Sequence, residues 1–319
     1  MASLVIHGGA GTVPRSTFTH QSYIIARDGL RDALRAGWAV LGKGGLALDA
    51  VEAAVVALED HTSFNAGRGA VLNAAGDHEL DAAIMDGRDR RAGAIASARA
   101  IRNPIRAARR VMEASDCVLL SAGGADAFAR EQGLAMVNQA YYTTELRQQH
   151  WNRAQEEKAG LLLRDRSEAE KHGTVGAVAC DAAGNLAAAT STGGYTGKRV
   201  GRVGDAPVIG AGTYACNGLV AVSCTGLGEF FIRRVTSHDI AARMRYRGDA
   251  LVVAAQAAID ELTADGCGGG LIAVDSRGNI AMPHNTEGMY RGSISADGTL
   301  SVGIYADDFV VVEQLKLTL

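Results

Sequence analysis

The amino-acid sequence predicts a layered α+β fold, in which apolar helices pack against mainly antiparallel sheet. Residues 177–194 and 271–288 each show a strand, an Asp-x-x-Gly-Asn turn and a second strand, which is typical of a β-hairpin. The helical pattern at 46–60 is apolar around most of its circumference, so it should lie between two layers. Glycine makes up 40 of 319 residues, above the usual share of roughly 7%, and lets neighbouring backbones approach closely.

The other elements follow from local patterns. Residues 4–6 form an apolar run that predicts a buried strand, and the glycine-rich residues 7–11 predict a turn after it. Asn103 and Pro104 are typical of the cap and the first residue of a helix. A further strand at 221–226 ends in Thr-Gly. The helical patterns lie at about 19–41, 46–60, 104–115, 229–245 and 249–264.

A charged stretch interrupts these elements at about 144–172. It is crowded with arginine, lysine and glutamate and has little strand signal. An exposed, mobile linker and a solvated helix explain this pattern equally well.

Composition and charge exclude several functional classes. The net charge of −3 argues against a nucleic-acid binder, which usually has a basic face. No apolar run reaches the roughly 18 to 20 residues that span a bilayer, and the first residues lack a signal-type segment. The five cysteines are scattered without a CxxC pair, so neither a disulfide framework nor a zinc site is indicated. We therefore expect a cytoplasmic protein without nucleic-acid or membrane partners.

The common catalytic motifs are absent from the sequence. It contains no phosphate loop, no GxGxxG after a strand, no GxSxG and no HExxH or HxH pair. What remains is a series of small hydroxyl residues and glycines at predicted strand ends, where threonine and glycine are also common for structural reasons. The series consists of Gly173-Thr174-Val175-Gly176, Thr190-Ser191-Thr192-Gly193-Gly194, Gly201-Arg202-Val203-Gly204-Asp205 and Thr225-Gly226-Leu227-Gly228-Glu229.

In order and spacing, these motifs resemble those of the plant-type asparaginase and isoaspartyl peptidase family of N-terminal nucleophile hydrolases. The resemblance runs from residue 4 to about 305 and is weakest in the charged stretch. It rests on residues 6–11, 64–69, 78–82, 102–104, 173–179, 189–194, 201–205, 223–226 and 285–291. It implies an αββα four-layer sandwich, self-cleavage before Thr174, and hydrolysis of L-asparagine and β-aspartyl (isoaspartyl) dipeptides through an acyl-threonine intermediate.

Thr174 suits this chemistry only after the chain is cut. A threonine hydroxyl is a poor nucleophile near neutral pH and needs an adjacent base. The free α-amino group of the same residue, with a pKa of about 7.7 to 8, can serve as that base. This amine exists only if the Gly173–Thr174 bond is broken, and Gly173 offers an unhindered carbonyl for attack by the Thr174 hydroxyl.

The resemblance assigns roles to further residues. Thr192 would hold the Thr174 hydroxyl, while Thr225 and the main-chain N–H of Gly226 would form the oxyanion hole. The implied substrate site consists of Arg202, Asp205, Thr225, Gly226, Leu227 and Gly228.

Within that site, Arg202 would clamp the substrate α-carboxylate with its planar fork, and Asp205 would receive the α-ammonium. Without the family context, these two residues could equally form an ion pair on the surface.

Two loops are implied by the resemblance alone. The loop at 7–9 resembles the family's glycine switch for self-cleavage, with Gly8 at its centre and Asn65 as a nearby helper. The loop from 58 to 68 resembles one that binds a structural sodium ion through main-chain oxygens, which suit a hard cation. The corresponding residues are Leu58, Glu59, His61, Phe64, Ala66 and Arg68.

The resemblance also implies how the protein is assembled. Residues 1–173 would be the α subunit, including the exposed linker at about 144–173, and residues 174–319 the β subunit of a single structural domain. A homodimer of cleaved α/β protomers is implied, and catalysis needs no cofactor. The alternatives are a glycosylasparaginase, which should carry Asp before the nucleophile, a taspase-like protease, which needs a larger insertion, and a non-catalytic small-molecule binder with the same fold.

Overall fold

The computed structural model describes residues 2–11, 14–16, 18–158 and 173–315. Its strands are β1 (Ser3–Ala10), β2 (Leu80–Asp86), β3 (Ala92–Ala98), β4 (Leu119–Ser121), β5 (Val175–Cys180), β6 (Leu186–Thr192), β7 (Thr213–Cys216), β8 (Val220–Gly226), β9 (Gly269–Asp275), β10 (Ile280–Ala281), β11 (Gly288–Ile294), β12 (Thr299–Tyr305) and β13 (Val310–Gln314). Its α-helices are α1 (His20–Leu41), α2 (Ala47–Asp60), α3 (Pro104–Ala114), α4 (Ala122–Glu131), α5 (Glu145–Lys158), α7 (Gly228–Arg234), α8 (Thr236–Ala242) and α9 (Leu251–Ala264). A 3₁₀ turn, Gln139–Tyr141, and a π-helical turn, Arg243–Arg247, complete the elements.

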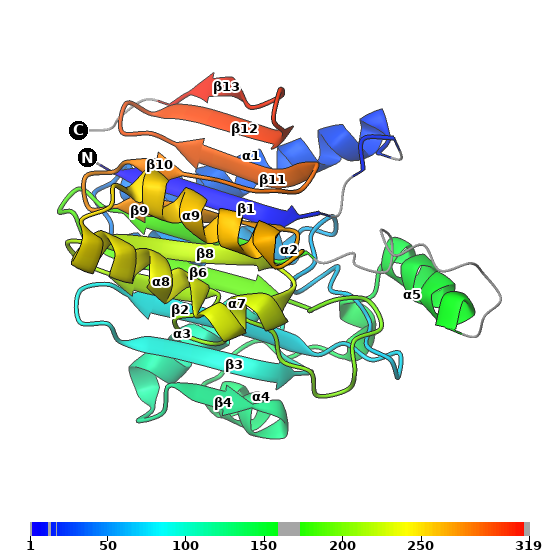
Figure 1. The fold of residues 1–319 in the computed structure, drawn as a ribbon. Coiled ribbons are helices and arrows are strands. Elements are labelled where there is room, and N and C mark those ends of the chain that lie inside the picture. The colour runs from blue at the N-terminus through cyan, green and yellow to red at the C-terminus, as the bar shows by residue number, and fades with distance from the viewer. Residues whose placement is uncertain (1, 12–13, 17, 159–172, 316–319) are drawn as a thin grey trace.

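The strands form two sheets (Figure 1). The large sheet has the order β13-β12-β11-β1-β5-β6-β2-β3-β4, and the small sheet has the order β10-β9-β8-β7. Neighbouring strands are antiparallel except for β3 and β4, which are parallel. The hairpins predicted at 177–194 and 271–288 are confirmed as β5–β6 and β9–β10.

The central strands of the large sheet are buried on both faces. Every residue of β1 is buried. Leu4 and Ile6 belong to the apolar core that includes α1 and α2, whereas Val5 belongs to the core that includes β8 and β9. Successive residues of a strand point to opposite faces, so this alternation places β1 between two apolar layers. This double burial explains why the strand reads as a continuous apolar run.

The helices lie on the outer faces of the two sheets. Helices α1, α2 and α3 contact the large sheet, and α7, α8 and α9 contact the small one, in front of the strands in Figure 1. Strands β1, β5 and β6 contact the small sheet directly. The mixed α+β class predicted from the sequence is therefore confirmed.

Two local predictions differ from the structure. The turn predicted at 7–11 is wrong for residues 7–10, because β1 continues through Ala10. Its pairing with β11 shifts between His7 and Gly9. Such an irregularity bends a strand, and the positive φ of 112° at Gly9 accommodates it. The single helix predicted at 229–245 is divided by Val235, whose left-handed φ of 51° ends α7 before α8 begins.

The side chain of Asn103, predicted to cap a helix, forms its hydrogen bond elsewhere. Pro104 is the first residue of α3, as expected. The Asn103 amide donates to a carboxylate oxygen of Asp60 at 3.2 Å instead of capping the helix. Asn103 therefore connects α3 to the end of α2.

In the charged stretch, the solvated-helix alternative holds for 145–158, which form α5. Two side chains attach this helix to the body. The buried Arg147 donates through Nε to the Gly69 carbonyl at 2.6 Å, and the Trp151 indole donates to the Asn73 carbonyl at 2.7 Å. Residues 159–172 of the predicted linker lie outside the described residues.

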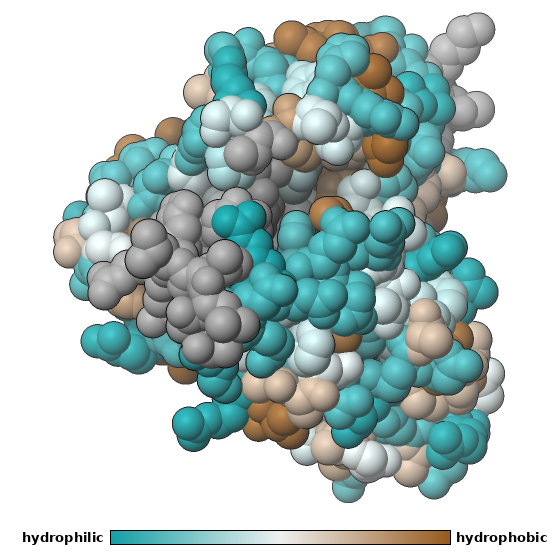
Figure 2. Space-filling model, turned by 90° about the vertical axis from the view of Figure 1, so that its right-hand side faces the viewer, coloured by the Kyte–Doolittle hydropathy of each residue, from teal (hydrophilic) through white to brown (hydrophobic). Residues whose placement is uncertain are grey.

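Among the described residues, no helix has both the length and the apolar character needed to cross a membrane. Figure 2 views the molecule from the side where α5 lies in Figure 1 and shows a mainly hydrophilic face with small, separate apolar patches. All five cysteines are free thiols.

Candidate active site

Thr174 lies beside Thr192 because of the β5–β6 hairpin. Antiparallel pairing matches Val175 with Ser191, so the start of β5 meets the end of β6. The Thr174 hydroxyl donates to Thr192 Oγ1 at 3.2 Å, and both residues are buried. The Gly194 main-chain N–H also donates to Thr192 Oγ1, at 2.9 Å. Thr192 is thus held firmly as the acceptor for the hydroxyl proton of Thr174.

The Gly173 carbonyl, just before Thr174, is polarised by two side chains. Asn65 Nδ2 donates to it at 2.6 Å and Thr192 Oγ1 donates to it at 2.9 Å. Asn65 is itself fixed, because its Oδ1 accepts from the Val71 main-chain N–H at 2.9 Å. A Cβ atom at position 173 would lie 2.9 Å from Asn65 Cβ, so glycine permits this close approach. Two donors aimed at a carbonyl oxygen stabilise negative charge on it during nucleophilic attack.

The bulged end of β1 lies against the same peptide. A Cβ atom at Gly9 would lie 3.0 Å from Gly173 Cα and 3.2 Å from the Thr174 main-chain nitrogen. A Cβ atom at Gly8 would lie 2.6 Å from the Phe64 ring. The predicted switch loop is therefore strand, yet it contacts the predicted cleavage site directly.

Thr225 and Gly226 end β8 next to β1. Thr225 is fully buried, and its hydroxyl oxygen accepts from the Ala10 main-chain N–H at 3.2 Å. This bond leaves the Thr225 O–H free to donate elsewhere. Gly226 has a φ of 156°, and a Cβ atom there would lie 3.0 Å from the Gly268 carbonyl oxygen.

Arg202 and Asp205 are not a surface ion pair, because both side chains are largely buried. Only 12% of the Arg202 side chain is exposed, and it pairs with Glu229 through Nε at 2.9 Å and Nη2 at 2.8 Å. The guanidinium also lies over the Tyr195 ring at 4.7 Å. The Nη1 group is not used by Glu229, and it lies 2.8 Å from where a Cβ atom at Gly204 would be and 3.4 Å from where one at Gly194 would be.

Asp205 is a buried carboxyl group with an unsatisfied oxygen. Burial raises its pKa to about 7, while the positive charge of Arg202 acts in the opposite direction. Among the described residues, its Oδ2 has no hydrogen-bond partner. A Cβ atom at Gly228 would lie 2.8 Å from Asp205 Oδ1 and 3.0 Å from Arg202 Nη2, so this glycine keeps the space between them open. Leu227 is the cap residue of the short helix α7 that begins with Gly228.

The loop predicted to bind sodium is compact and lined by main-chain oxygens. The Arg68 N–H donates to the Glu59 carbonyl at 2.7 Å. The Glu59 side chain accepts through Oε1 from Ser191 Oγ and the Ile105 N–H. A Cβ atom at Gly69 would lie 2.7 Å from the Thr62 carbonyl oxygen and 2.8 Å from that of Phe64. Converging carbonyl oxygens fit a hard monovalent cation.

For the other predicted ligands of this loop, the structure gives only local hydrogen bonds and exposure. The Leu58 carbonyl accepts from the His61 N–H at 3.3 Å, and the His61 carbonyl accepts from the Phe64 N–H at 3.4 Å. Ala66 is buried and Arg68 is exposed. Among the described residues, no cluster of His, Cys, Asp or Glu side chains could hold a metal ion.

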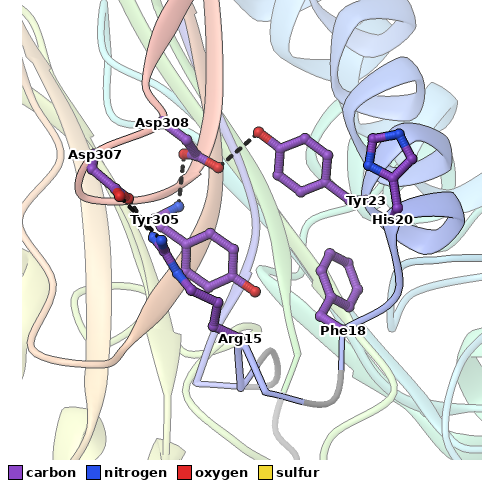
Figure 3. Close-up of a pocket in the computed structure, with 7 residues that line it drawn as sticks. All are labelled: Arg15, Phe18, His20, Tyr23, Tyr305, Asp307 and Asp308. Atoms are coloured by element: carbon purple, nitrogen blue, oxygen red, sulfur yellow. Dashed lines mark hydrogen bonds and ion pairs between the residues drawn. The ribbon is translucent and has the colours of Figure 1, made fainter.

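A separate cavity of about 370 Å³ lies where α1 begins (Figure 3). Its lining includes none of the predicted site residues. Arg15 pairs with Asp307 and lies over the Tyr305 ring at 4.3 Å, while the Tyr23 hydroxyl donates to Asp308. These contacts connect Arg15 and the first turn of α1 to the end of β12 and the loop after it. The lining residues are Arg15, Phe18, His20, Tyr23, Tyr305, Asp307 and Asp308.

Comparison with known protein families identifies the family of this chain. A family model described as asparaginase matches residues 1–304 of the chain. The chain belongs to the asparaginase family.

Relatives within the asparaginase family cover nearly the whole chain. An isoaspartyl peptidase of Salmonella typhimurium is 47% identical over 312 residues, covering 96% of this chain and 99% of that protein. An isoaspartyl peptidase of Escherichia coli is 47% identical over 310 residues, covering 96% and 97%. A plant-type L-asparaginase of Pyrococcus abyssi is 43% identical over 302 residues, covering 91% and 95%.

In this member of the asparaginase family, sequence reasoning missed a buried lysine beside the predicted substrate site. Lys198 is fully buried, and its Nζ donates to the Glu79 carbonyl at 2.9 Å. Burial lowers its pKa, while the charges of Asp81 and Glu79 act in the opposite direction. The Glu79 carboxylate also accepts from the Gly201 N–H, so these residues fix the loop that carries Arg202. The lysine sits in a glycine-rich loop, and lysine is usually exposed, so the sequence offered no clear signal.

Proposed function

We propose that this protein is an isoaspartyl peptidase and L-asparaginase that first cuts its own chain between Gly173 and Thr174. The observation that carries the proposal is the Gly173 carbonyl, which accepts hydrogen bonds from Asn65 and Thr192 beside the Thr174 hydroxyl. A buried peptide with two donors on its oxygen and a hydroxyl next to it is arranged for attack by that hydroxyl.

Self-cleavage proceeds by an acyl shift. The Thr174 Oγ1 bonds to the Gly173 carbonyl carbon, the C–N bond breaks, and the released nitrogen takes up the hydroxyl proton. Asn65 and Thr192 stabilise the negative charge on the carbonyl oxygen during this step. Water then hydrolyses the ester, which leaves Gly173 as a carboxylate and Thr174 with a free amine and hydroxyl.

The mature enzyme uses the same hydroxyl on a substrate. The Thr174 amine accepts the hydroxyl proton, Oγ1 attacks the substrate β-carbonyl, and the amine then protonates the leaving nitrogen. The Thr225 hydroxyl and the Gly226 N–H stabilise the oxyanion, for which the Thr225 O–H is available as a donor. Water hydrolyses the acyl-threonine to release aspartate.

Substrate binding rests on Arg202 and Asp205. The Nη1 group of Arg202 takes the α-carboxylate, and the Asp205 carboxylate, which has an unsatisfied oxygen, takes the α-ammonium. The names of the relatives support a β-aspartyl group as the common part of the substrates. Gly228 and the Leu227 main chain border this pocket.

The assembly belongs to the proposal as well. The two facing sheets with helices outside support an αββα four-layer sandwich. Residues 1–173 and 174–319 become the α and β subunits of one domain, and two such protomers form a dimer. The loop at 58–68 takes a structural sodium ion, and catalysis requires no cofactor. The free thiols suit a cytoplasmic setting.

The proposal is tested by a denaturing gel and an assay of the purified protein. Wild type should give two bands, corresponding to residues 1–173 and 174–319. It should also hydrolyse L-asparagine and β-Asp-Leu. Thr174→Ala should stay a single band without activity, because it lacks both the attacking hydroxyl and the new threonine terminus. Normal cleavage of that variant would rule out Thr174 as the nucleophile. A wild type that remains uncut and inert would instead favour a small-molecule binder with this fold.

A further inference from the structure

A second row of polar side chains lies deeper in the molecule than the threonines of the site. Thr190 is two residues before Thr192 on β6, and Ser223 is two residues before Thr225 on β8, so each shares a strand face with the site residue after it. The two hydroxyl oxygens are 2.7 Å apart, which joins the large sheet to the small one.

Two further side chains extend this row. His7 Nε2, on β1, lies 2.9 Å from Ser223 Oγ. Thr213, on β7, has its hydroxyl oxygen 2.6 Å from Thr190 Oγ1 and 3.0 Å from the Ala206 carbonyl oxygen. All four side chains are fully buried. We call His7, Thr190, Thr213 and Ser223 the polar row.

Glycine at position 176 makes room for this row. It is two residues after Thr174 and pairs with both His7 and Thr190 in the large sheet. A Cβ atom there would lie 2.0 Å from Ser223 Oγ and 2.4 Å from His7 Nε2. Glycine weakens a strand interior, so its presence in β5 indicates that a close approach is needed at this point.

His7 serves this row as a neutral ring. Burial lowers its pKa to about 3, with the main chain of Thr174 as the smaller, opposing influence. A neutral imidazole has one donor and one acceptor nitrogen, so it can hold Ser223 without a buried charge. The contact between His7 Nε2 and the Ser223 oxygen therefore gives the ring a positional role.

Strand β1 thus contacts β8 twice, through His7 to Ser223 and through the Ala10 N–H to Thr225. The same part of β1 contacts the Gly173–Thr174 peptide through Gly9. We infer that Ser223, held between His7 and Thr190, is a positioning residue that sets the distance between the oxyanion donors on β8 and the nucleophile on β5. This inference rests on the proposed function.

The test compares Ser223→Ala with Ser237→Ala in the mature enzyme. Ser237 is also fully buried, but its hydroxyl has no hydrogen-bond partner in the part of the chain that the structure describes. Ser223→Ala should still cut itself, because the donors to Gly173 are Asn65 and Thr192. Its kcat should fall about 10- to 100-fold with KM within about threefold, since a shift of about 1 Å at reacting groups costs this much. Ser237→Ala should change neither constant.

A second pair of variants keeps the test decisive if Ser223→Ala does not fold. Thr190→Val keeps the side-chain volume without the hydroxyl and should lower kcat, whereas Thr190→Ser keeps the hydroxyl and should restore it. The double variant Ser223→Ala/Thr190→Val should be no slower than the slower single variant, because both disturb one contact. Wild-type kcat in Ser223→Ala, or equal losses in Ser237→Ala, would overturn the positioning role. Failure of wild type itself to cut and hydrolyse would overturn the proposed function instead.

Discussion

Buried polar groups lie at both ends of the strands, but they differ in whether hydrogen bonds from the protein satisfy them. At the end opposite Thr174, the turns after β5 and β9 place Asp181 and Asp275 next to their own asparagines. Asp181 accepts from the main-chain N–H groups of Ala183 and Asn185, and Asp275 accepts in the same way from Arg277 and Asn279. These carboxylates are surrounded by donors that belong to the fold.

At the other end, where β1 finishes in Figure 1, the polar groups are incomplete. Asp205 is buried with an oxygen that has no partner among the described residues, and burial raises its pKa to about 7. Arg202 binds Glu229 through Nε and Nη2, so its Nη1 group, close to Gly194 and Gly204, is not used in this ion pair. Leaving a buried polar group unsatisfied costs stability, so its persistence indicates that a ligand completes it. We therefore expect the satisfied end to be structural and the unsatisfied end to bind the substrate.

The largest expected effect is that of Arg202→Ala. The variant should still cut itself, yet KM for L-asparagine should rise about 100-fold or more, since a charge-assisted contact contributes about 3 kcal/mol. Steady-state kinetics on the mature protein measure this. Arg234→Ala is a matched control, because Arg234 pairs with Glu261 and Asp265 outside the site. An unchanged KM in Arg202→Ala would remove the carboxylate clamp from the mechanism.

Asp205→Asn should weaken binding and yet stabilise the fold. Folding raises the pKa of this carboxyl from 3.8 to about 7, so its ionisation opposes folding as pH rises between those values. Thermal unfolding should therefore show a higher Tm for Asp205→Asn than for wild type at pH 8, and the difference should shrink towards pH 4.

The same substitution should change the pH profile. The acidic limb of kcat/KM should be shallower in Asp205→Asn, because the Asp205 carboxyl no longer contributes to it. A lower Tm in the variant at pH 8 would mean that Asp205 is a satisfied group after all, like those at the turn end.

The smallest kinetic effect is expected at the turn end. Asp181→Ala removes the acceptor of the Ala47, Ala183 and Asn185 N–H groups, so the free energy of unfolding should fall by about 2 kcal/mol. Denaturant unfolding measures this loss, while kcat and KM should stay at wild-type values. A kinetic defect in this variant would show that the two ends are not separable.

Local patterns predicted the elements that depend on neighbouring residues. The hairpins and the helix α2 follow from turn chemistry and periodicity, whereas the contact between Thr174 and Thr192 was expected from the family resemblance alone. The resemblance to a known family supplied the roles of the other threonines, Arg202 and Asp205. Those roles remain predictions.

What the sequence could not predict depends on contacts between distant segments. His7 and Ser223 meet only because β1 lies beside β8 across the two sheets, and no spacing in the chain signals this. Lys198 lies in a loop that is fixed by Glu79, just before β2 and more than a hundred residues earlier in the chain. The bulge in β1 looked like a turn because its glycines suit both structures.

The double burial of the central strands also limits how this protein can diverge. A strand with one solvent-exposed face tolerates substitution at every second position. Strands β1, β5 and β6 have no solvent-exposed face. A Cβ atom at Gly93, on β3, would lie 2.1 Å from the Ala108 carbonyl of the overlying helix, so even the smallest side chain lacks room. New specificities should therefore arise mainly in the connecting loops and on the outer helices, and a saturation mutagenesis map should show β1, β5 and β6 as nearly uninterrupted intolerant bands.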